Sequence, residues 1–161
     1  MTTVTTALVV ELDDLEEAEI TELRSVVTKT LASFRTVQAD PSAVLGWTVS
    51  TAAELHRRLI AKNRPVQAKT IAAQAQAGGD CSREQVYRIG DYDPAERSLS
   101  GFTKPVAGVM RQMIAEGLLP VDAVNPMQPI YDPANPSFQK AQGFRMPTEL
   151  APVFAAALAA Q

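Results

Sequence analysis

Two cations, Lys104 and Arg111, stand seven residues apart in a segment with the pattern of one helix. Seven residues make about two helical turns, so both side chains lie on one face. Between them this face carries only the small residues Ala107 and Gly108, so it can come close to a partner. Lys and Arg are the side chains that proteins use for phosphates and base edges. The pattern therefore indicates a surface that contacts DNA.

The boundaries of this helix are also predictable. Thr103 suits the N-cap position, where its hydroxyl can accept from a free backbone N–H, and Pro105 lies in the first turn, where its missing N–H costs nothing. Gly117 suits the left-handed conformation that ends a helix. The opposite face is apolar at helical spacing, with Val106, Val109, Met110, Met113 and Ile114. We predict a helix with one buried face and one exposed basic face.

Charge is unevenly distributed along the 161 residues. Residues 1–54 carry a net charge of −6, residues 55–112 carry +5, and residues 113–161 carry −2, within a total of −3. The basic charge thus concentrates in the segment that contains the Lys104 helix. Such asymmetry suggests a polyanion as the partner.

The sequence contains few side chains that could form a catalytic site. His56 is the only histidine and stands next to Arg57 and Arg58, and a lone helical histidine is most often a surface or half-buried packing residue. Cys81 is the only cysteine; it is either a small residue at a helix start or a redox sensor whose pKa that helix start lowers. One histidine and one cysteine make no metal site. We expect neither an enzyme nor a cofactor.

Composition indicates a cytoplasmic globular protein. Hydrophobic residues make up 46% and charged residues 20% of the chain, which is ordinary for such a domain. We expect no membrane span and no signal peptide, and a single cysteine is typical of a reducing compartment. The alanine-rich composition suggests a bacterial or phage source.

An N-terminal arm is predicted over residues 1–46, comprising a possible strand, a long helix with an acidic start, and a linker. Apolar residues recur along that helix at intervals of three and four, and they are Ile20, Leu23, Val27, Leu31 and Phe34. This narrow stripe is of the coiled-coil kind. It either packs on its own chain or pairs with a second chain, and we favour a homodimer.

Residues 47–161 form the second predicted domain. Thr51 and Glu54 have the spacing of a capping box, opening a helix that buries Leu55, Leu59 and Ile60 and ends near Asn63. A helix over 66–77 follows, and a Ser82–Gln85 capping box opens a short helix. A basic cluster comprises Arg57, Arg58, Lys62, Arg64 and Lys69. It either contacts phosphate or pairs with the acidic arm.

After Pro120 the pattern changes to short apolar stretches between prolines. The stretch around Met127–Tyr131 and the stretch around Phe144–Met146 flank the turn-rich segment Asp132–Ser137, which indicates a β-hairpin. A closing helix is expected from Thr148 to Ala160. The predicted fold class is therefore mainly α with a small β-hairpin, an α+β fold.

From residue 50 onward, this order of elements resembles the winged helix-turn-helix superfamily. Ser82–Tyr87 resembles its supporting helix, and Gly101–Val106 resembles the start of its recognition helix. The resemblance implies a recognition helix at about 103–116 in the DNA major groove and a wing at about 125–146. It implies DNA contacts from Thr103, Lys104, Arg111 and Gln112 on the recognition helix, from Arg83, Arg88 and Arg97 beside it, and from Lys140 and Arg145 in the wing.

The sequence thus predicts a homodimeric transcriptional regulator that binds double-stranded DNA. The alternative is a winged-helix adaptor that binds proteins and not DNA, because the whole chain is acidic and winged helices also serve in protein complexes. A ligand-sensing role remains open. The aromatic residues that could line such a pocket, or equally form the core, are Trp47, Tyr87, Phe102 and Tyr131.

Overall fold

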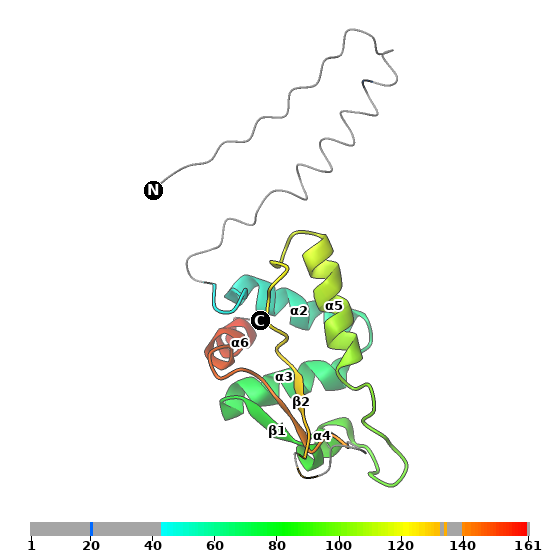
Figure 1. Cartoon of the computed structure of the whole chain (residues 1–161). Coiled ribbons are helices and arrows are strands. Elements are labelled where there is room, and N and C mark those ends of the chain that lie inside the picture. Colours follow the sequence, from blue (N-terminus) through cyan, green and yellow to red (C-terminus); the bar gives the residue numbers. More distant parts are fainter. Residues whose placement is uncertain (1–19, 21–42, 133, 135–139, 161) are drawn as a thin grey trace. The chain divides into compact units, whose positions relative to one another are not determined.

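The computed structural model of the chain describes residue 20, residues 43–132, residue 134 and residues 140–160 (Figure 1). Contacts divide the chain into two units, Met1–Arg35 and Thr36–Gln161, and the elements below belong to the second. The predicted N-terminal helix and its stripe lie outside the described residues except for Ile20, which is helical. The tip of the predicted hairpin lies outside them as well, apart from Asp132 and Ala134.

Five helices and three strands make up the described part of the second unit. In chain order they are α2 (Val49–Ala61), α3 (Pro65–Ala77), β1 (Asp80–Ser82), α4 (Arg83–Gly90), α5 (Lys104–Ala115), β2 (Gln128–Ile130), β3 (Gly143–Arg145) and α6 (Ala151–Ala159). This mixture of helices with a small antiparallel sheet confirms the predicted α+β class. The hairpin of β2 and β3 is also confirmed.

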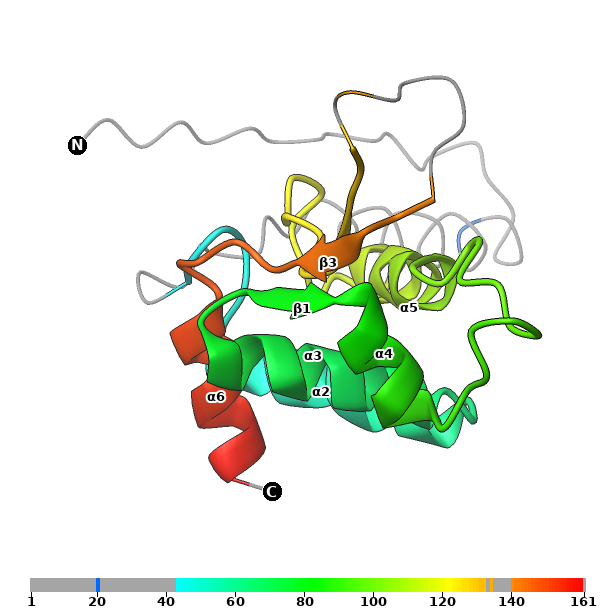
Figure 2. The same cartoon turned by 90° about the horizontal axis from the view of Figure 1, so that it is seen from below.

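Strand β3 lies at the centre of the sheet, between β1 and β2 and antiparallel to both. Its middle residue, Phe144, stands opposite Cys81 on one side and Pro129 on the other. The Phe144 ring is buried and lies 5.0 Å from the ring of Phe102, which lies in the turn that leads into α5. Figure 2 shows β1 and β3 lying across α3 and α4. The sheet therefore joins the hairpin to the helices before it.

Strand β1 is absent from the sequence prediction, because three residues are too few to show an alternating pattern. It runs directly into α4, whose predicted capping box is confirmed. The Ser82 hydroxyl accepts from the backbone N–H of Gln85 at 3.2 Å, and the Gln85 side chain accepts from the N–H of Ser82 at 2.6 Å. This box fixes the point where the strand becomes a helix.

Helix α2 begins three residues earlier than the predicted capping box. Its N-cap is Thr48, whose hydroxyl accepts from the N–H of Thr51, and Thr51 reciprocates as the third helical residue. Glu54 is therefore one turn into the helix. Leu55 and Leu59 are buried as predicted, whereas Ile60 is 49% exposed. Ile60 follows Leu59 directly and is rotated by about 100° away from the buried face.

Helix α5 has the predicted extent and buried face, but Thr103 does not cap it as predicted. The Thr103 backbone is already helical, with φ −82° and ψ −14°, and its hydroxyl makes no capping hydrogen bond. The cause is a turn just before it, in which the N–H of Lys104 donates to Gly101 at 3.0 Å. At the other end Gly117 has φ +73°, which confirms the predicted left-handed stop. Val106, Val109, Met110 and Met113 are buried, and Ile114 is half-buried.

Trp47 anchors the start of the second unit to its end. The indole is fully buried, its Nε1 donates to the carbonyl of Val124 at 2.7 Å, and its ring lies 5.1 Å from that of Phe154 on α6. Tyr87 and Phe102 are buried as well. These three belong to the core, while Tyr131 is 44% exposed.

We expect Phe144→Ala to lower the free energy of unfolding by about 3–5 kcal/mol, because it removes a buried ring and leaves a cavity at the centre of the sheet. Urea denaturation followed by circular dichroism measures this. The neighbouring substitution Arg145→Ala is the control, and it should cost far less stability, because its ion pair with Asp80 is exposed. Equal losses for the two variants would contradict this role of Phe144.

Candidate nucleic-acid interface

The exposed side of α5 carries the predicted basic face. Lys104, Arg111 and Gln112 are exposed, while Ala107 and Gly108 lie half-buried between them. A methyl group placed on Gly108 would meet nothing nearer than the Arg111 guanidinium at 3.9 Å, so the surface between the two cations is low and open. A partner can therefore approach the helix backbone closely there.

A cleft of about 670 Å³ runs along this side of α5. Its other wall is the turn between α2 and α3, which contributes Lys62 and Arg64, and Arg111 comes from α5 itself. No carboxylate of the described residues lines this cleft. Two segments about 40 residues apart in sequence thus place three cations around one groove.

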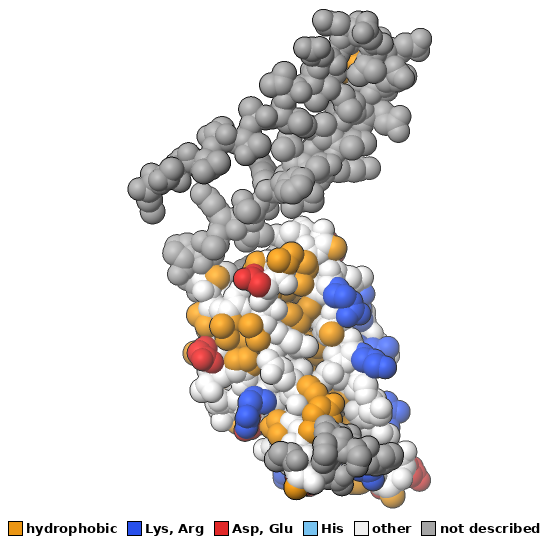
Figure 3. Space-filling view, in the orientation of Figure 1, with side chains coloured by type: hydrophobic (Ala, Val, Ile, Leu, Met, Phe, Trp, Pro, Cys, Tyr) orange, Lys and Arg blue, Asp and Glu red, His pale blue; other side chains and the backbone are white. Residues whose placement is uncertain are grey.

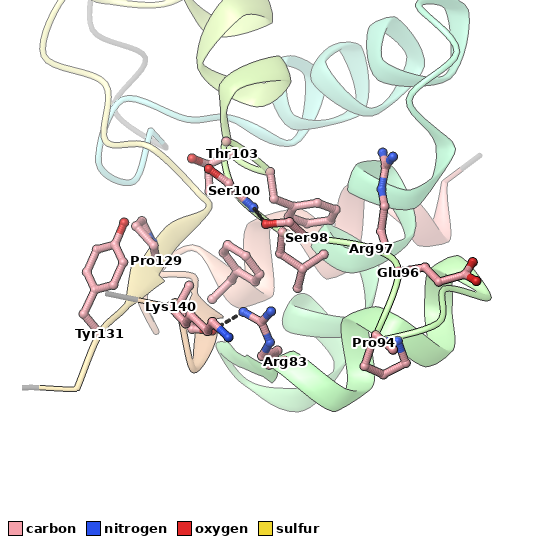
Figure 4. Close-up of a pocket in the computed structure, with 16 residues that line it drawn as sticks. Arg83, Pro94, Glu96, Arg97, Ser98, Ser100, Thr103, Pro129, Tyr131 and Lys140 are labelled. Atoms are coloured by element: carbon pink, nitrogen blue, oxygen red, sulfur yellow. Dashed lines mark hydrogen bonds between the residues drawn. The ribbon is translucent and has the colours of Figure 1, made fainter. Parts of the chain in front are cut away.

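Two further clefts continue this surface toward the hairpin. The first, of about 370 Å³, shares Arg64 and Pro105 with the groove along α5 and adds Lys104 and Arg97. The second, of about 530 Å³, shares Arg97 and the residues up to Phe102, and it adds Arg83 and Lys140 (Figure 4). Each cleft shares lining residues with the next, so the three clefts lie next to one another.

The basic surface, as we call the lining of these three clefts, contains seven cations and one carboxylate among the described residues. The cations are Lys62, Arg64, Arg83, Arg97, Lys104, Arg111 and Lys140, and the carboxylate is Glu96. None of the seven forms an ion pair with a described carboxylate. Figure 3 shows Lys and Arg side chains spaced along the edge of the body beside α5. The surface is therefore strongly positive although the chain is acidic overall.

Arg83 holds the hairpin end of this surface together. Its guanidinium donates to the carbonyl of Ala141 at 3.0 Å and to the hydroxyl of Tyr87, and it lies over the Tyr87 ring. The Tyr87 hydroxyl in turn donates to the carbonyl of Arg97 at 3.0 Å. This network fixes the hairpin, α4 and the connection before α5 relative to one another. Figure 4 shows Lys140 close to Arg83, whereas Arg97 points away from both.

Residues 91–103 connect α4 to α5, a stretch far longer than a tight helix-turn-helix turn. Leu99 and Phe102 are buried and anchor this connection to the core. The Asp93 carboxylate accepts from the N–H of Ala95 at 2.8 Å, which closes a turn at its start. The anchors leave Arg97, Ser98 and Ser100 exposed on the basic surface.

Most of the sequence-predicted DNA contacts gather on the basic surface. Lys104, Arg111 and Gln112 line it from α5, and Thr103 lines it from just before α5. Arg83, Arg97 and Lys140 line it from the other elements. Two predicted residues line none of the three clefts. Arg88 is exposed on α4, and Arg145 donates to Asp80 at 2.8 and 3.0 Å in an exposed ion pair that lowers the pKa of Asp80.

The basic cluster predicted over residues 57–69 divides into separate groups. Arg57 donates to Glu54 at 2.7 and 2.8 Å, and Arg58 bridges Glu54 to Glu116, with 2.6 Å between Arg58 and the second carboxylate. Lys62 and Arg64 instead line the groove beside α5. The sequence analysis did not predict that Lys62 and Arg64 lie beside α5, because only tertiary packing brings these two segments together. The one indication in the sequence was that both residues follow directly after the end of α2.

These ion pairs shift the pKa of Glu54 to about 2, mainly through the hydrogen bond from Arg57 and then that from Arg58. The hydrogen bond from Arg58 likewise lowers the pKa of Glu116. Arg58 thereby ties α2 to the C-terminal end of α5.

The thiol of Cys81 has a raised pKa, whereas a redox-sensing cysteine has a lowered one. Its side chain is 1% exposed, and burial raises the pKa of the thiol to about 11, with Arg88 opposing the rise. Of the two alternatives that the sequence offers for Cys81, burial favours the small packing residue, because desolvation of the thiolate outweighs any effect of the nearby helix start. Cys81 packs in the core as a small apolar residue. His56 lies half-buried on α2.

Comparison of the chain with family models, with curated proteins and with solved structures finds no match. In the part of the chain that the structure describes, no helix is long and apolar enough to cross a bilayer. The same residues contain no group of three His, Cys, Asp or Glu side chains that could hold a metal ion.

Acid should reveal the contribution of Glu54. Because its pKa is lowered from 4.5 to about 2 by folding, the stability that it contributes is present above about pH 4.5 and is lost as the pH falls toward 2. We expect Glu54→Gln to lower the free energy of unfolding at pH 7 by about 0.5–1 kcal/mol, and the difference from wild type to vanish near pH 2. Urea denaturation at several pH values measures this.

The control is Glu149→Gln, because Glu149 is exposed and forms no ion pair with a described cation. This substitution should leave the pH dependence of stability nearly unchanged. Equal effects of the two substitutions would contradict the role given to Glu54.

Proposed function

We propose that this chain is a DNA-binding transcriptional regulator of the winged helix-turn-helix kind. The observation that carries the proposal is the basic surface, where seven cations from five segments surround the exposed side of α5. The element order from α3 to β3, with β3 paired between β1 and β2, supports the resemblance found in the sequence. A local positive surface on an acidic chain is typical of electrostatic recognition of a polyanion.

In this proposal α5 enters the major groove. A helix of 12 residues is about 18 Å long, and the major groove of B-DNA accommodates such a helix. The low surface at Ala107 and Gly108 lets the backbone approach the bases. Arg111 and Gln112 then reach base edges, because Arg can donate two hydrogen bonds to guanine and Gln can pair with adenine.

The other cations of the basic surface contact phosphates beside α5. Lys62 and Arg64 line the cleft along α5, and Arg97 and Lys140 line the cleft toward the hairpin. Arg83 has the additional task of holding the hairpin, since its donors already bind Ala141 and Tyr87. Phosphate contacts position the protein on the duplex, whereas the α5 contacts specify sequence.

Binding should therefore depend strongly on salt. Each neutralised phosphate adds about 0.9 to the slope of log affinity against log salt. We expect Lys62→Ala combined with Arg64→Ala to weaken binding to all duplexes and to reduce this slope by about 2. Arg111→Ala should cost about 1–3 kcal/mol on the preferred site and relax its sequence preference. Fluorescence anisotropy with random and selected duplexes, at low and moderate salt, measures both effects.

The matched control combines Arg57→Ala with Lys69→Ala, which removes the same charge from outside the three clefts. The proposal predicts that this control binds DNA almost as well as wild type. Wild-type protein that binds no DNA at low salt would contradict the proposal. Equal weakening by the control and by the Lys62–Arg64 variant would show that only total charge matters.

A further inference from the structure

The cleft between the hairpin and the connection before α5, which we call the hairpin cleft, has the size and lining of a small-molecule site. Its volume is about 530 Å³, within the range of about 300–1,000 Å³ that is usual for such sites. The buried apolar side chains that line it are Leu99, Phe102 and Phe144. The hydroxyl side chains that line it are Ser98, Ser100 and Thr103. An apolar lining with a few polar groups is typical of sites for small organic ligands.

A fixed guanidinium stands in the hairpin cleft. Arg83 donates to the carbonyl of Ala141 at 3.0 Å and to the hydroxyl of Tyr87, and it lies 5.1 Å from the centre of the Tyr87 ring. A guanidinium has five N–H donors, so three of them form no hydrogen bond within the described residues. The Arg83 side chain is half-buried, and a half-buried cation with unused donors favours an anion as its partner. Because neutral groups already hold Arg83 in place, an anion that binds there orders little additional structure.

Lys140 adds a second positive charge on the same side of the hairpin cleft. Figure 4 shows Lys140 close to Arg83, whereas Glu96, the one carboxylate among the described residues that line the cleft, stands on the other side. Neither cation forms an ion pair with a described carboxylate, and the sequence between Asp132 and Lys140 contains no Asp or Glu. Two neighbouring cations repel each other. A phosphate group relieves this repulsion and accepts hydrogen bonds from both.

The hairpin also places an exposed aromatic ring at this cleft. Tyr131 is 44% exposed, and it lines the cleft together with Pro129, on the side where Lys140 lies (Figure 4). An exposed aromatic face is a stacking surface for the flat ring of a ligand. The hairpin cleft therefore offers donors for a phosphate and a stacking surface for a ring within one volume.

We propose that the hairpin cleft binds a small molecule that joins a phosphate group to a flat ring, as a nucleoside monophosphate does. The phosphate accepts hydrogen bonds from Arg83 and Lys140, and the ring stacks on Tyr131. The hydroxyl side chains of the lining bind the polar atoms between them. Binding at this site does not require DNA, whereas its consequence for DNA rests on the proposed function. The bound phosphate neutralises two cations of the basic surface and should weaken the binding of a duplex.

Isothermal titration calorimetry of the full chain, without DNA and at one low ionic strength, tests this site. The probe is adenosine monophosphate, and the comparison probes are adenosine and inorganic phosphate. We expect adenosine monophosphate to bind saturably, with one molecule per chain, and each comparison probe to bind at least about tenfold more weakly, because each lacks one of the two groups that the cleft binds. No binding of adenosine monophosphate would overturn the proposal, and so would a comparison probe that binds as tightly.

Substitutions locate the binding. Lys140→Ala should weaken the binding of adenosine monophosphate about tenfold, and Tyr131→Ala should weaken it about fivefold; both residues are exposed, so neither change disturbs the core. The matched control is Lys69→Ala, which removes one positive charge from an exposed position outside the three clefts. The control should bind the nucleotide as wild type does. Equal weakening by Lys140→Ala and Lys69→Ala would overturn the site, because net charge alone would then attract the nucleotide.

Nucleotide binding and DNA binding are measured separately, so the failure of one is distinguishable from the failure of the other. A chain that binds adenosine monophosphate in this cleft but binds no duplex retains the site and contradicts the proposed function. A chain that binds a duplex but no nucleotide contradicts the site alone. Where both bind, adenosine monophosphate should lower the affinity for the duplex in fluorescence anisotropy at constant ionic strength, and adenosine should not. An unchanged affinity for the duplex would overturn the competition for Lys140.

Discussion

The central position of β3 is the constraint on which the rest of the structure depends. Because Phe144 pairs with Cys81 on one side and with Pro129 on the other, one buried residue joins the start of α4 to the hairpin. Its contact with Phe102 extends this link to the connection that leads into α5. Strand β3 begins 28 residues after the end of α5, and this sheet places the cations of the hairpin near those of the helix.

The ion pairs of the chain determine which cations remain for a partner. Glu54 and Glu116 engage Arg57 and Arg58 between α2 and α5, and Asp80 engages Arg145 at the end of the sheet. The basic surface holds cations around α5 and the hairpin that form no such pair with a described carboxylate. Structural and binding roles are thus divided among basic side chains that look alike in the sequence.

The sequence predicted those features that depend on local signals. The extent of α5, its stop at Gly117 and the Ser82–Gln85 box follow from residues within a few turns of each other, and the hairpin follows from two short apolar stretches around one turn-rich segment. It did not predict β1, which is too short to show a pattern. It also placed the start of α2 three residues too late, because Thr51 and Glu54 have the same capping-box spacing as Thr48 and Thr51. The pairing of Lys62 and Arg64 with α5 could not be predicted, because only tertiary packing brings the two segments together. Likewise the exposure of Ile60 depends on which face of α2 the core selects.

The most direct measurement of the central claim is an NMR titration of the labelled chain with a short DNA duplex. Our account predicts that the amide signals of Arg64, Gly101 and Gly108, which line successive clefts of the basic surface, shift together and saturably, and that those of α6 stay in place. It also predicts that the shifts shrink as salt is added. Shifts confined to other faces, or no shifts at low salt, would contradict the assignment of the basic surface to DNA.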